Sequence, residues 1–462
     1  MKRLRVTLIA SFAVLATVLA TSLPAAAAGG HFTGTIDGAK YIIDVPSNWN
    51  GTLVLYSHGY TLPEVELTAF DAPNDGATGP WLLANGYALA GSSYSQNGWA
   101  LKEAFHDQIA LLDYFKANFA GLKRTIAWGH SLGGMITAGL IQLFPDRFAG
   151  AIPMCGVVAG GPGVWNSALD AEFVFKTLLA PDSGLQLVNL SNPNPFTSAN
   201  LGLAESILSA ANGTAAGRAR TALVAAVGDS PGWFTTGAPQ PAQTDYAARE
   251  QNQMLWDQNV TFPFVFALRG ELEARAGGNP SWNTGVDYRK LLAHSINKDE
   301  VEALYQQAGL SLDADLDTLA GTPRISANPA ALGYLEKYIV YNGQLESPVL
   351  TMHTIGDGLV LPQDEQAYAS VVRSEGNQSL LRQVFVNRAG HCALPDLDQP
   401  APHRALGGCH LARGHECHRQ WPSASGGVQP AAGVIRGLPT VPVPAPVRRQ
   451  ERGGRGLKPL TG

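Results

Sequence analysis

Three residues in this chain have the types and the order needed for nucleophilic catalysis. A serine hydroxyl is a weak nucleophile near neutral pH, so it needs a histidine base and a carboxylate that orients the histidine. The chain offers Ser131, Asp357 and His391 in that order. Ser131 stands between Gly129 and Gly133, a pattern typical of a sharp strand-to-helix turn where larger side chains would collide with the flanking elements. These residues predict acyl transfer through a covalent serine intermediate.

Each candidate also has a second interpretation. The serine could cap a helix, and Asp357 could be a turn aspartate, with Asp364 or another acid as the partner of the histidine. His353 and His106 compete with His391 for the role of base. His353 lies inside a predicted strand and is expected to be a packed core histidine, whereas His106 is expected on a helix surface.

The predicted elements place all three candidates at one edge of a sheet. The apolar run that begins at Arg124 leads into Ser131, and predicted strands at 348–353 and 381–387 end just before Asp357 and His391. Parallel sheets bind ligands at the carboxyl ends of their strands. The agreement of motif, order and position therefore favours a real catalytic group over a chance pattern.

The rest of the chain alternates apolar strands with helices, which predicts an α/β fold with a mostly parallel, doubly wound sheet. A hairpin is expected within 34–45. Further predicted strands are 52–57, 87–93 and 149–155, and predicted helices are 80–84, 100–119, 135–144 and 365–374.

This alternation divides the chain into four regions. We expect a catalytic domain from 29–160 and 347–395, interrupted by a helical lid at 161–346 with alanine-rich helical stretches. These stretches are 170–179, 200–227 and 298–308. Residues 396–462 lose all periodicity and are rich in His, Arg, Pro and Gly, which predicts a disordered tail. The alternative is a shifted reading frame that has replaced a closing helix.

The amino-terminal residues indicate the compartment. Residues 1–28 have a basic start, an apolar stretch and small residues at the end, which predicts a secretory signal peptide rather than a retained membrane anchor. The net charge of −5 argues against nucleic acid as a partner. In an exported protein, Cys155 and Cys392 at neighbouring strand ends invite a disulfide, with two buried free thiols as the alternative. A metal site is not expected.

Several segments together resemble the α/β-hydrolase superfamily, in particular secreted bacterial lipases and esterases with a helical lid. The matching segments are His58-Gly59, residues 129–134, residues 356–362 and Gly390-His391. The resemblance implies an α/β-hydrolase fold and a catalytic triad with Ser131 as nucleophile, Asp357 as acid and His391 as base.

The resemblance also implies an oxyanion hole next to the nucleophile. The residue after the His-Gly pair supplies one amide in this superfamily, which is Tyr60 here, and the amide of Leu132 supplies the other. His58 and Gly59 belong to this loop, and His58 is expected to order it through a hydrogen bond to backbone. His130 is expected to line the site.

The expected activity is the hydrolysis of a small or polymeric carboxylic ester by a secreted monomer without a cofactor. A lidded serine aminopeptidase is one alternative, and it would need lid carboxylates such as Glu271 or Glu273 to hold the substrate amine. A non-catalytic binding protein of the same fold is another. Aromatic residues of the lid could line an apolar pocket or simply pack the lid: Trp165, Phe173, Phe175, Trp233, Phe234, Trp256 and Phe264.

Overall fold

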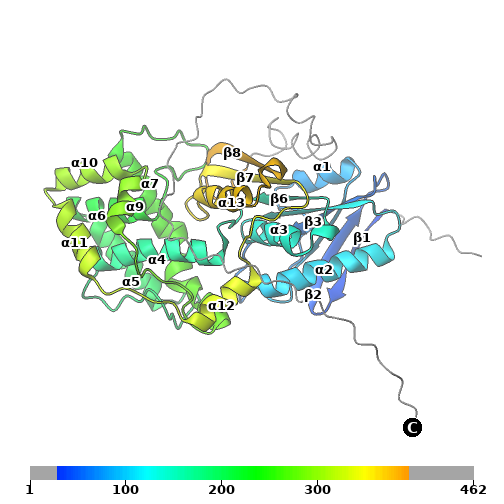
Figure 1. The fold of residues 1–462 in the computed structure, drawn as a ribbon, viewed down its shortest axis with the longest axis horizontal. Coiled ribbons are helices and arrows are strands. Elements are labelled where there is room, and N and C mark those ends of the chain that lie inside the picture. Colours follow the sequence, from blue (N-terminus) through cyan, green and yellow to red (C-terminus); the bar gives the residue numbers. More distant parts are fainter. Residues whose placement is uncertain (1–28, 395–462) are drawn as a thin grey trace, which may run out of the picture.

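A computed structural model describes residues 29–394 of the chain. The predicted signal peptide and the predicted tail from 396 onward lie outside these residues. The described part contains an eight-stranded sheet with strand order β1-β2-β4-β3-β5-β6-β7-β8 (Figure 1). Its strands are β1 (Gly30–Ile36), β2 (Ala39–Val45), β3 (Thr52–Ser57), β4 (Ala88–Ser92), β5 (Arg124–His130), β6 (Gly150–Met154), β7 (Val349–Gly356) and β8 (Leu381–Ala389).

The pairing of these strands confirms the predicted sheet. The hairpin of β1 and β2 joins β4 in antiparallel fashion, whereas β4, β3, β5, β6, β7 and β8 run parallel to their neighbours. Because these strands all point in the same direction, the carboxyl ends of β5, β7 and β8 lie at the same edge of the sheet. The candidate residues follow these three strands.

The central strands are apolar on both faces because helices cover both sides of the sheet. Leu53 and Leu55 of β3 pack into one core, and the alternate residues Val54 and Tyr56 pack into another. The covering helices are α1 (Thr78–Ala84), α2 (Leu101–Asn118), α3 (Leu132–Leu143) and α13 (Gln363–Ser374). Each lies within a few residues of its predicted position.

A second group of helices, which we call the inserted helices, lies between β6 and β7 and extends to one side of the sheet (Figure 1). They are α4 (Gly160–Leu179), α5 (Ala199–Asn212), α6 (Ala215–Val227), α7 (Tyr246–Trp256), α8 (Arg269–Ala276), α9 (Tyr288–His294), α10 (Lys298–Ala308), α11 (Leu312–Gly321) and α12 (Pro329–Tyr338), with π-helical turns at Asp257–Thr261 and Phe264–Leu268. Their own hydrophobic core includes Phe173, Phe175 and Phe266.

The structure refines the predicted helical stretches of this region. The stretch 200–227 is two helices, because the Thr214 side chain accepts a hydrogen bond from the Gly217 N–H and so starts a new helix. The helix at 298–308 has its predicted bounds. Helices α7, α8, α9, α11 and α12 were not predicted from the sequence.

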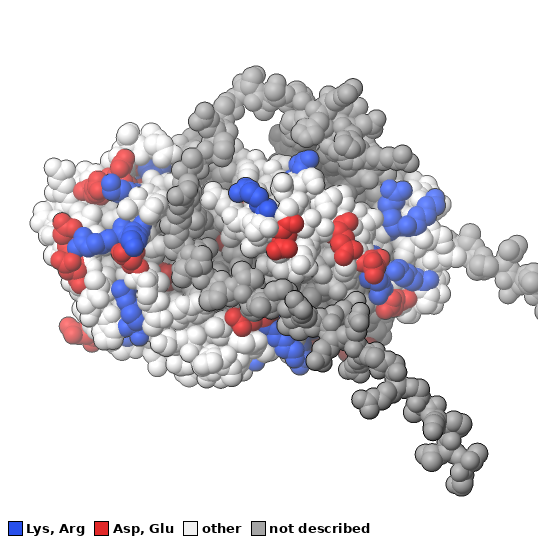
Figure 2. All heavy atoms as spheres, in the orientation of Figure 1, with Lys and Arg blue, Asp and Glu red and all other residues white. Residues whose placement is uncertain are grey.

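Charged side chains of both signs are interspersed on the face shown in Figure 2. Arg289 pairs with Asp313 and Asp317 on the surface of the inserted helices. Within residues 29–394, each helix is too short or too polar to cross a lipid bilayer.

The turn between β5 and α3 is packed so closely that two of its positions accept only glycine. A Cβ atom on Gly133 would lie 2.0 Å from the carbonyl oxygen of Ser57, and one on Gly129 would lie 2.4 Å from the carbonyl oxygen of Gly133. Between them Ser131 has a φ of 58°. Strained backbone of this kind persists only where the surroundings over-determine it.

A disulfide joins the end of β6 to the loop after β8. Cys155 and Cys392 are bonded across a sequence separation of 237 residues, with their Cα atoms 5.4 Å apart. The sequence left a choice between a disulfide and two free thiols, and the structure contains the disulfide. It closes a loop that includes all of the inserted helices.

We predict that Gly133→Ala lowers the free energy of unfolding by about 2–3 kcal/mol, because the added methyl group meets backbone that cannot move aside. Gly333→Ala is the matched control, since a Cβ atom on this α12 glycine would have no atom within 4 Å. The control should leave stability unchanged or raise it by about 0.5–1 kcal/mol. Urea unfolding of both variants gives the comparison, and equal effects would contradict this account of the turn.

We predict that the double variant Cys155→Ala/Cys392→Ala loses about 3 kcal/mol of stability, because the bond restricts the unfolded chain. Thermal unfolding with and without dithiothreitol provides the check. The reductant should lower the Tm of the parent protein and leave the double variant unaffected. If complete reduction left the Tm of the parent protein unchanged, the disulfide would contribute nothing to stability.

Candidate active site

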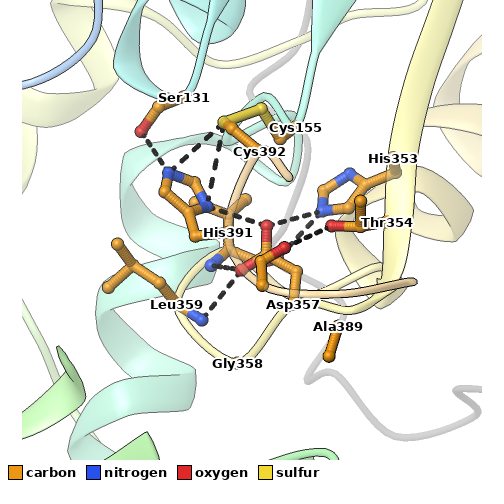
Figure 3. A network of polar contacts seen from close by, with 12 residues as sticks. Ser131, Cys155, His353, Thr354, Asp357, Gly358, Leu359, Ala389, His391 and Cys392 are labelled. Atoms are coloured by element: carbon orange, nitrogen blue, oxygen red, sulfur yellow. Dashed lines mark hydrogen bonds and ion pairs between the residues drawn. A yellow bond between two sulfur atoms is a disulfide. The ribbon is translucent and has the colours of Figure 1, made fainter. Parts of the chain in front are cut away.

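The structure brings Ser131, His391 and Asp357 into one hydrogen-bonded line (Figure 3). Ser131 is held at the junction of β5 and α3, where its N–H donates to the Met154 carbonyl oxygen at 3.0 Å. Its Oγ lies 2.9 Å from Nε2 of His391. A serine in this position can transfer its proton to the imidazole as it attacks an electrophile.

His391 lies in the loop that follows β8, and contacts on several sides fix this loop. The Gly390 N–H donates to the Gly356 carbonyl oxygen, and the Thr354 hydroxyl donates to the Gly390 carbonyl oxygen. The disulfide sulfur of Cys392 lies 3.5 Å from Nε2 of the histidine. The imidazole therefore has little freedom to rotate away from the serine.

Asp357 follows β7 and is fully buried, yet its surroundings favour the ionised form. Its Oδ2 is 2.7 Å from Nδ1 of His391, and its Oδ1 accepts the backbone N–H groups of Leu359 and Val360 at 3.0 and 3.1 Å. Burial alone would raise the pKa of this carboxyl. The charge of His391 and hydrogen bonds from His353 and His391 outweigh burial and lower the pKa to about 2.

Asp364 and His106, considered as alternatives to Asp357 and His391, do not take part in the hydrogen-bonded line with Ser131. Asp357, and not Asp364, receives the hydrogen bond from His391. Asp364 is buried on α13, where burial raises its pKa to about 7. His106 is on the surface of α2 with 65% of its side chain exposed, and it pairs with Asp107.

His353 is in the core, as expected, but it is not merely packed there. Its Nε2 is 3.6 Å from Oδ2 of Asp357 (Figure 3). Its Nδ1 is 3.2 Å from Oε1 of Glu365 on α13. Neither this contact nor Glu365 was predicted from the sequence. The only available signal was the spacing of four residues between His353 and Asp357, which is not diagnostic in a strand.

The loop after β3 approaches the serine from the other side. A Cβ atom on Gly59 would lie 3.3 Å from Cβ of Ser131, so this glycine allows the loop to come close. The Nδ1–H of His58 donates to the Gly59 carbonyl oxygen at 2.7 Å, and the His58 ring stacks on Tyr94. Burial lowers the pKa of His58, which keeps the ring neutral.

The two expected oxyanion donors belong to this neighbourhood. Leu132 is the first residue of α3, so its N–H has no acceptor within the helix. Tyr60 directly follows Gly59, and its ring meets Phe264 of the inserted helices edge to face at a centroid distance of 5.4 Å. His130, expected to line the site, packs its ring against Tyr56 and Trp128.

The inserted helices hold the loops that carry the acid and the base. The Trp256 ring packs on Gly358, where a Cβ atom would lie 2.5 Å from it, and Trp256 Nε1 donates to the Trp233 carbonyl oxygen. The Thr236 hydroxyl donates to the Ala389 carbonyl oxygen next to the histidine loop. Thr236 was missed because a lone threonine in a loop carries no sequence signal.

The aromatic residues named from the sequence fall into two groups: some pack inside the inserted region, and others contact the loops of the site. Phe173 and Phe175 belong to the core of the inserted helices, and Trp165 packs against Trp99. Trp233, Trp256 and Phe264 are the ones that contact the loops of the site, with Phe234 packed on Trp256. Within residues 29–394, His, Cys, Asp and Glu form no group of three or more that could hold a metal ion.

Comparison with known proteins places this site in context. Residues 85–160 match the prolyl oligopeptidase family. An o-phthalyl amidase from Xanthobacter agilis is 30% identical over 383 residues, which cover 77% of this chain and 82% of the relative. The match thus covers more than two thirds of both proteins.

Solved structures with similar folds include esterases and peptidases. Feruloyl esterase B from Aspergillus oryzae is 13% identical, with a TM-score of 0.40, covering 79% of this chain and 73% of the esterase. Proline iminopeptidase from Mycobacterium smegmatis is 13% identical, with a TM-score of 0.36, covering 82% of this chain and 96% of the peptidase. On the match to the amidase, the chain belongs to the same family as the o-phthalyl amidase, and with its mostly parallel sheet it is a serine hydrolase of the α/β-hydrolase superfamily.

Proposed function

We propose that the protein hydrolyses carboxylic esters and amides by two-step acyl transfer through Ser131. The observation that carries this proposal is the continuous line from Ser131 Oγ to His391 Nε2 at 2.9 Å and from His391 Nδ1 to Asp357 Oδ2 at 2.7 Å. In this line each residue has one role: Ser131 is the nucleophile, His391 the base, and Asp357 the carboxylate that orients it.

In the first step, Ser131 Oγ attacks the substrate carbonyl carbon while its proton moves to Nε2 of His391. The amides of Tyr60 and Leu132 donate to the oxyanion of the tetrahedral intermediate. When the carbon–oxygen or carbon–nitrogen bond breaks, His391 gives its proton to the departing alcohol or amine. The acyl group stays on Ser131 as an ester.

In the second step, a water molecule attacks the acyl carbon while His391 accepts one of its protons. The intermediate collapses, the bond to Ser131 Oγ breaks, and His391 returns the proton to the serine. The products are a carboxylic acid and the regenerated enzyme. Asp357 stays ionised in both steps, since its pKa of about 2 lies far below working pH.

We infer that the acyl group is aromatic and that amides are included among the substrates. Two observations support this. The relative at 30% identity is named for an amide of o-phthalic acid. The oxyanion loop and the inserted helices also meet through the rings of Tyr60 and Phe264, which offer flat apolar surface beside the serine. Residues 161–346 would then act as the lid that selects the substrate.

The aminopeptidase alternative finds less support. Its candidate carboxylates are already engaged: Glu271 pairs with Arg275 and accepts the Trp99 N–H, and Glu273 pairs with Arg269 and accepts the Leu190 N–H. They are neither free to bind an amine nor solvated helix charges. A buried carboxylate with a full set of partners gains little from a further cation.

We also infer that the protein is exported and acts as a monomer. The support for export is the composition of residues 1–28, together with a disulfide in the described part of the chain. Disulfides persist in oxidising compartments.

We predict that Ser131→Ala lowers kcat by about 10⁴-fold or more, because the covalent route is lost. Reaction of the folded protein with a fluorophosphonate probe, followed by mass spectrometry, should label Ser131 in the parent and nothing in this variant. Ser206→Ala on α5 is the control and should keep full labelling. A folded parent that the probe does not label would favour a non-catalytic binding protein.

We predict that a phthalyl or benzoyl anilide and a 4-nitrophenyl ester are both hydrolysed, whereas aminoacyl 4-nitroanilides are poor substrates. The reason is that the same acyl-enzyme serves both leaving groups, while Glu271 and Glu273 are not available for a free substrate amine. The kcat/KM values of the three substrate classes provide the measurement. Preference for the aminoacyl anilide would overturn the proposed substrate class.

A further inference from the structure

The hydrogen-bonded line of the site continues past the acid to two further side chains. Behind Asp357 lie His353 and then Glu365, both fully buried. His353 Nε2 is 3.6 Å from Oδ2 of Asp357 (Figure 3), and His353 Nδ1 is 3.2 Å from Oε1 of Glu365. A histidine that lies between two carboxylates in the protein interior can be neutral or charged, and its contacts indicate which.

Each ring nitrogen of His353 lies beside an oxygen that can accept a hydrogen bond. Nε2 lies 2.9 Å from the Val360 carbonyl oxygen, which can only accept a hydrogen bond. Nδ1 faces Oε1 of Glu365. The other oxygen of Glu365 is saturated by donors, the Thr351 hydroxyl at 2.5 Å and the Gln383 amide at 2.7 Å, so this carboxyl is set up as an acceptor.

The electrostatic balance agrees with an imidazolium at this position. Burial disfavours the charge, but the hydrogen bonds and negative charges of Asp357 and Glu365 outweigh burial and raise the pKa of His353 to about 10. The other titratable neighbours are His391, on the far side of Asp357, and Asp364 on α13. Burial and the negative charges of Glu365 and Asp357 raise the pKa of Asp364, and the charge of His353 opposes this.

We propose that His353 is a permanently charged positioning residue for the acid of the triad, anchored by Glu365. It acts in two ways. Through the Val360 carbonyl it holds the turn whose amides donate to Asp357, so the carboxylate keeps its orientation. Through its charge it offsets part of the field of Asp357, so that His391 is not held in its protonated form. This inference rests on the proposed function of Ser131, His391 and Asp357.

The sign of the effect follows from the charges. With His353 charged, Glu365, His353 and Asp357 together carry one negative charge, and proton uptake by His391 makes the set neutral. Removal of the His353 charge leaves two negative charges beside His391 and favours its protonated, inactive form. The acid limb of the kcat/KM profile must then move to higher pH.

The first test is the pH dependence of His353→Gln, which keeps a hydrogen-bond donor and removes the charge. We expect the acid limb to rise by about one pH unit. Thr351→Val is the matched control, because it removes a donor to the same Glu365 on the same strand without changing any charge. Its acid limb should stay where the parent has it. A folded His353→Gln protein with an unmoved limb would overturn the proposal.

The second test needs neither activity nor a variant. Nuclear magnetic resonance of protein labelled with ¹⁵N-histidine reports which ring nitrogens carry protons, and sequential assignment identifies His353. Both of its nitrogens should be protonated at pH 8. An unprotonated ring nitrogen of His353 at pH 8 would overturn the proposal. If the protein hydrolysed neither esters nor amides, the proposed function would be wrong. The resonance measurement would still determine the protonation state of His353.

Discussion

The hydrogen bond between Asp357 and His391 is the contact on which the rest of the site depends. It joins two loops that are close only because β7 and β8 are parallel neighbours whose carboxyl ends coincide. It also requires a fully buried carboxylate to stay ionised, and a buried charge without partners is very unfavourable. Two backbone amides, His391 and the His353 imidazolium together supply those partners. The acid is therefore stable only as part of this arrangement.

This constraint explains why regions far apart in the sequence converge on two short loops. The histidine loop is tied to β6 by the disulfide of Cys392 and to the inserted helices by Thr236. The acid loop is covered by Trp256, which fits against it only because residue 358 is glycine. A shift of the inserted helices would thus move the acid and the base as well as the substrate surface. Substrate selection and the geometry of proton transfer are mechanically linked in this fold.

The sequence predicts the sheet well because its signals are local. Buried parallel strands are short apolar runs, and β3 was found with its exact bounds, while the glycines around Ser131 mark the turn that presents it. Most inserted helices were missed because they are short. Helices α7, α9 and α11 pack into the separate core of the insertion, whereas α8 and α12 pack into the core that includes the sheet. His353 was recognised as a core residue but not as a charged one. Its state depends on Glu365, which reaches it only through the packing of α13 on β7.

The distribution of charge along the line suggests why so many ionisable groups are buried together. During acyl transfer, a proton moves onto His391 while negative charge develops on the substrate oxygen. If Asp357 were alone, its full negative field would already favour the protonated histidine before any substrate bound. A fixed positive charge behind the acid reduces that ground-state preference, while the hydrogen bond from His391 to Asp357 still stabilises the imidazolium as it forms. Burial makes this balance possible, since mobile ions and water would screen it.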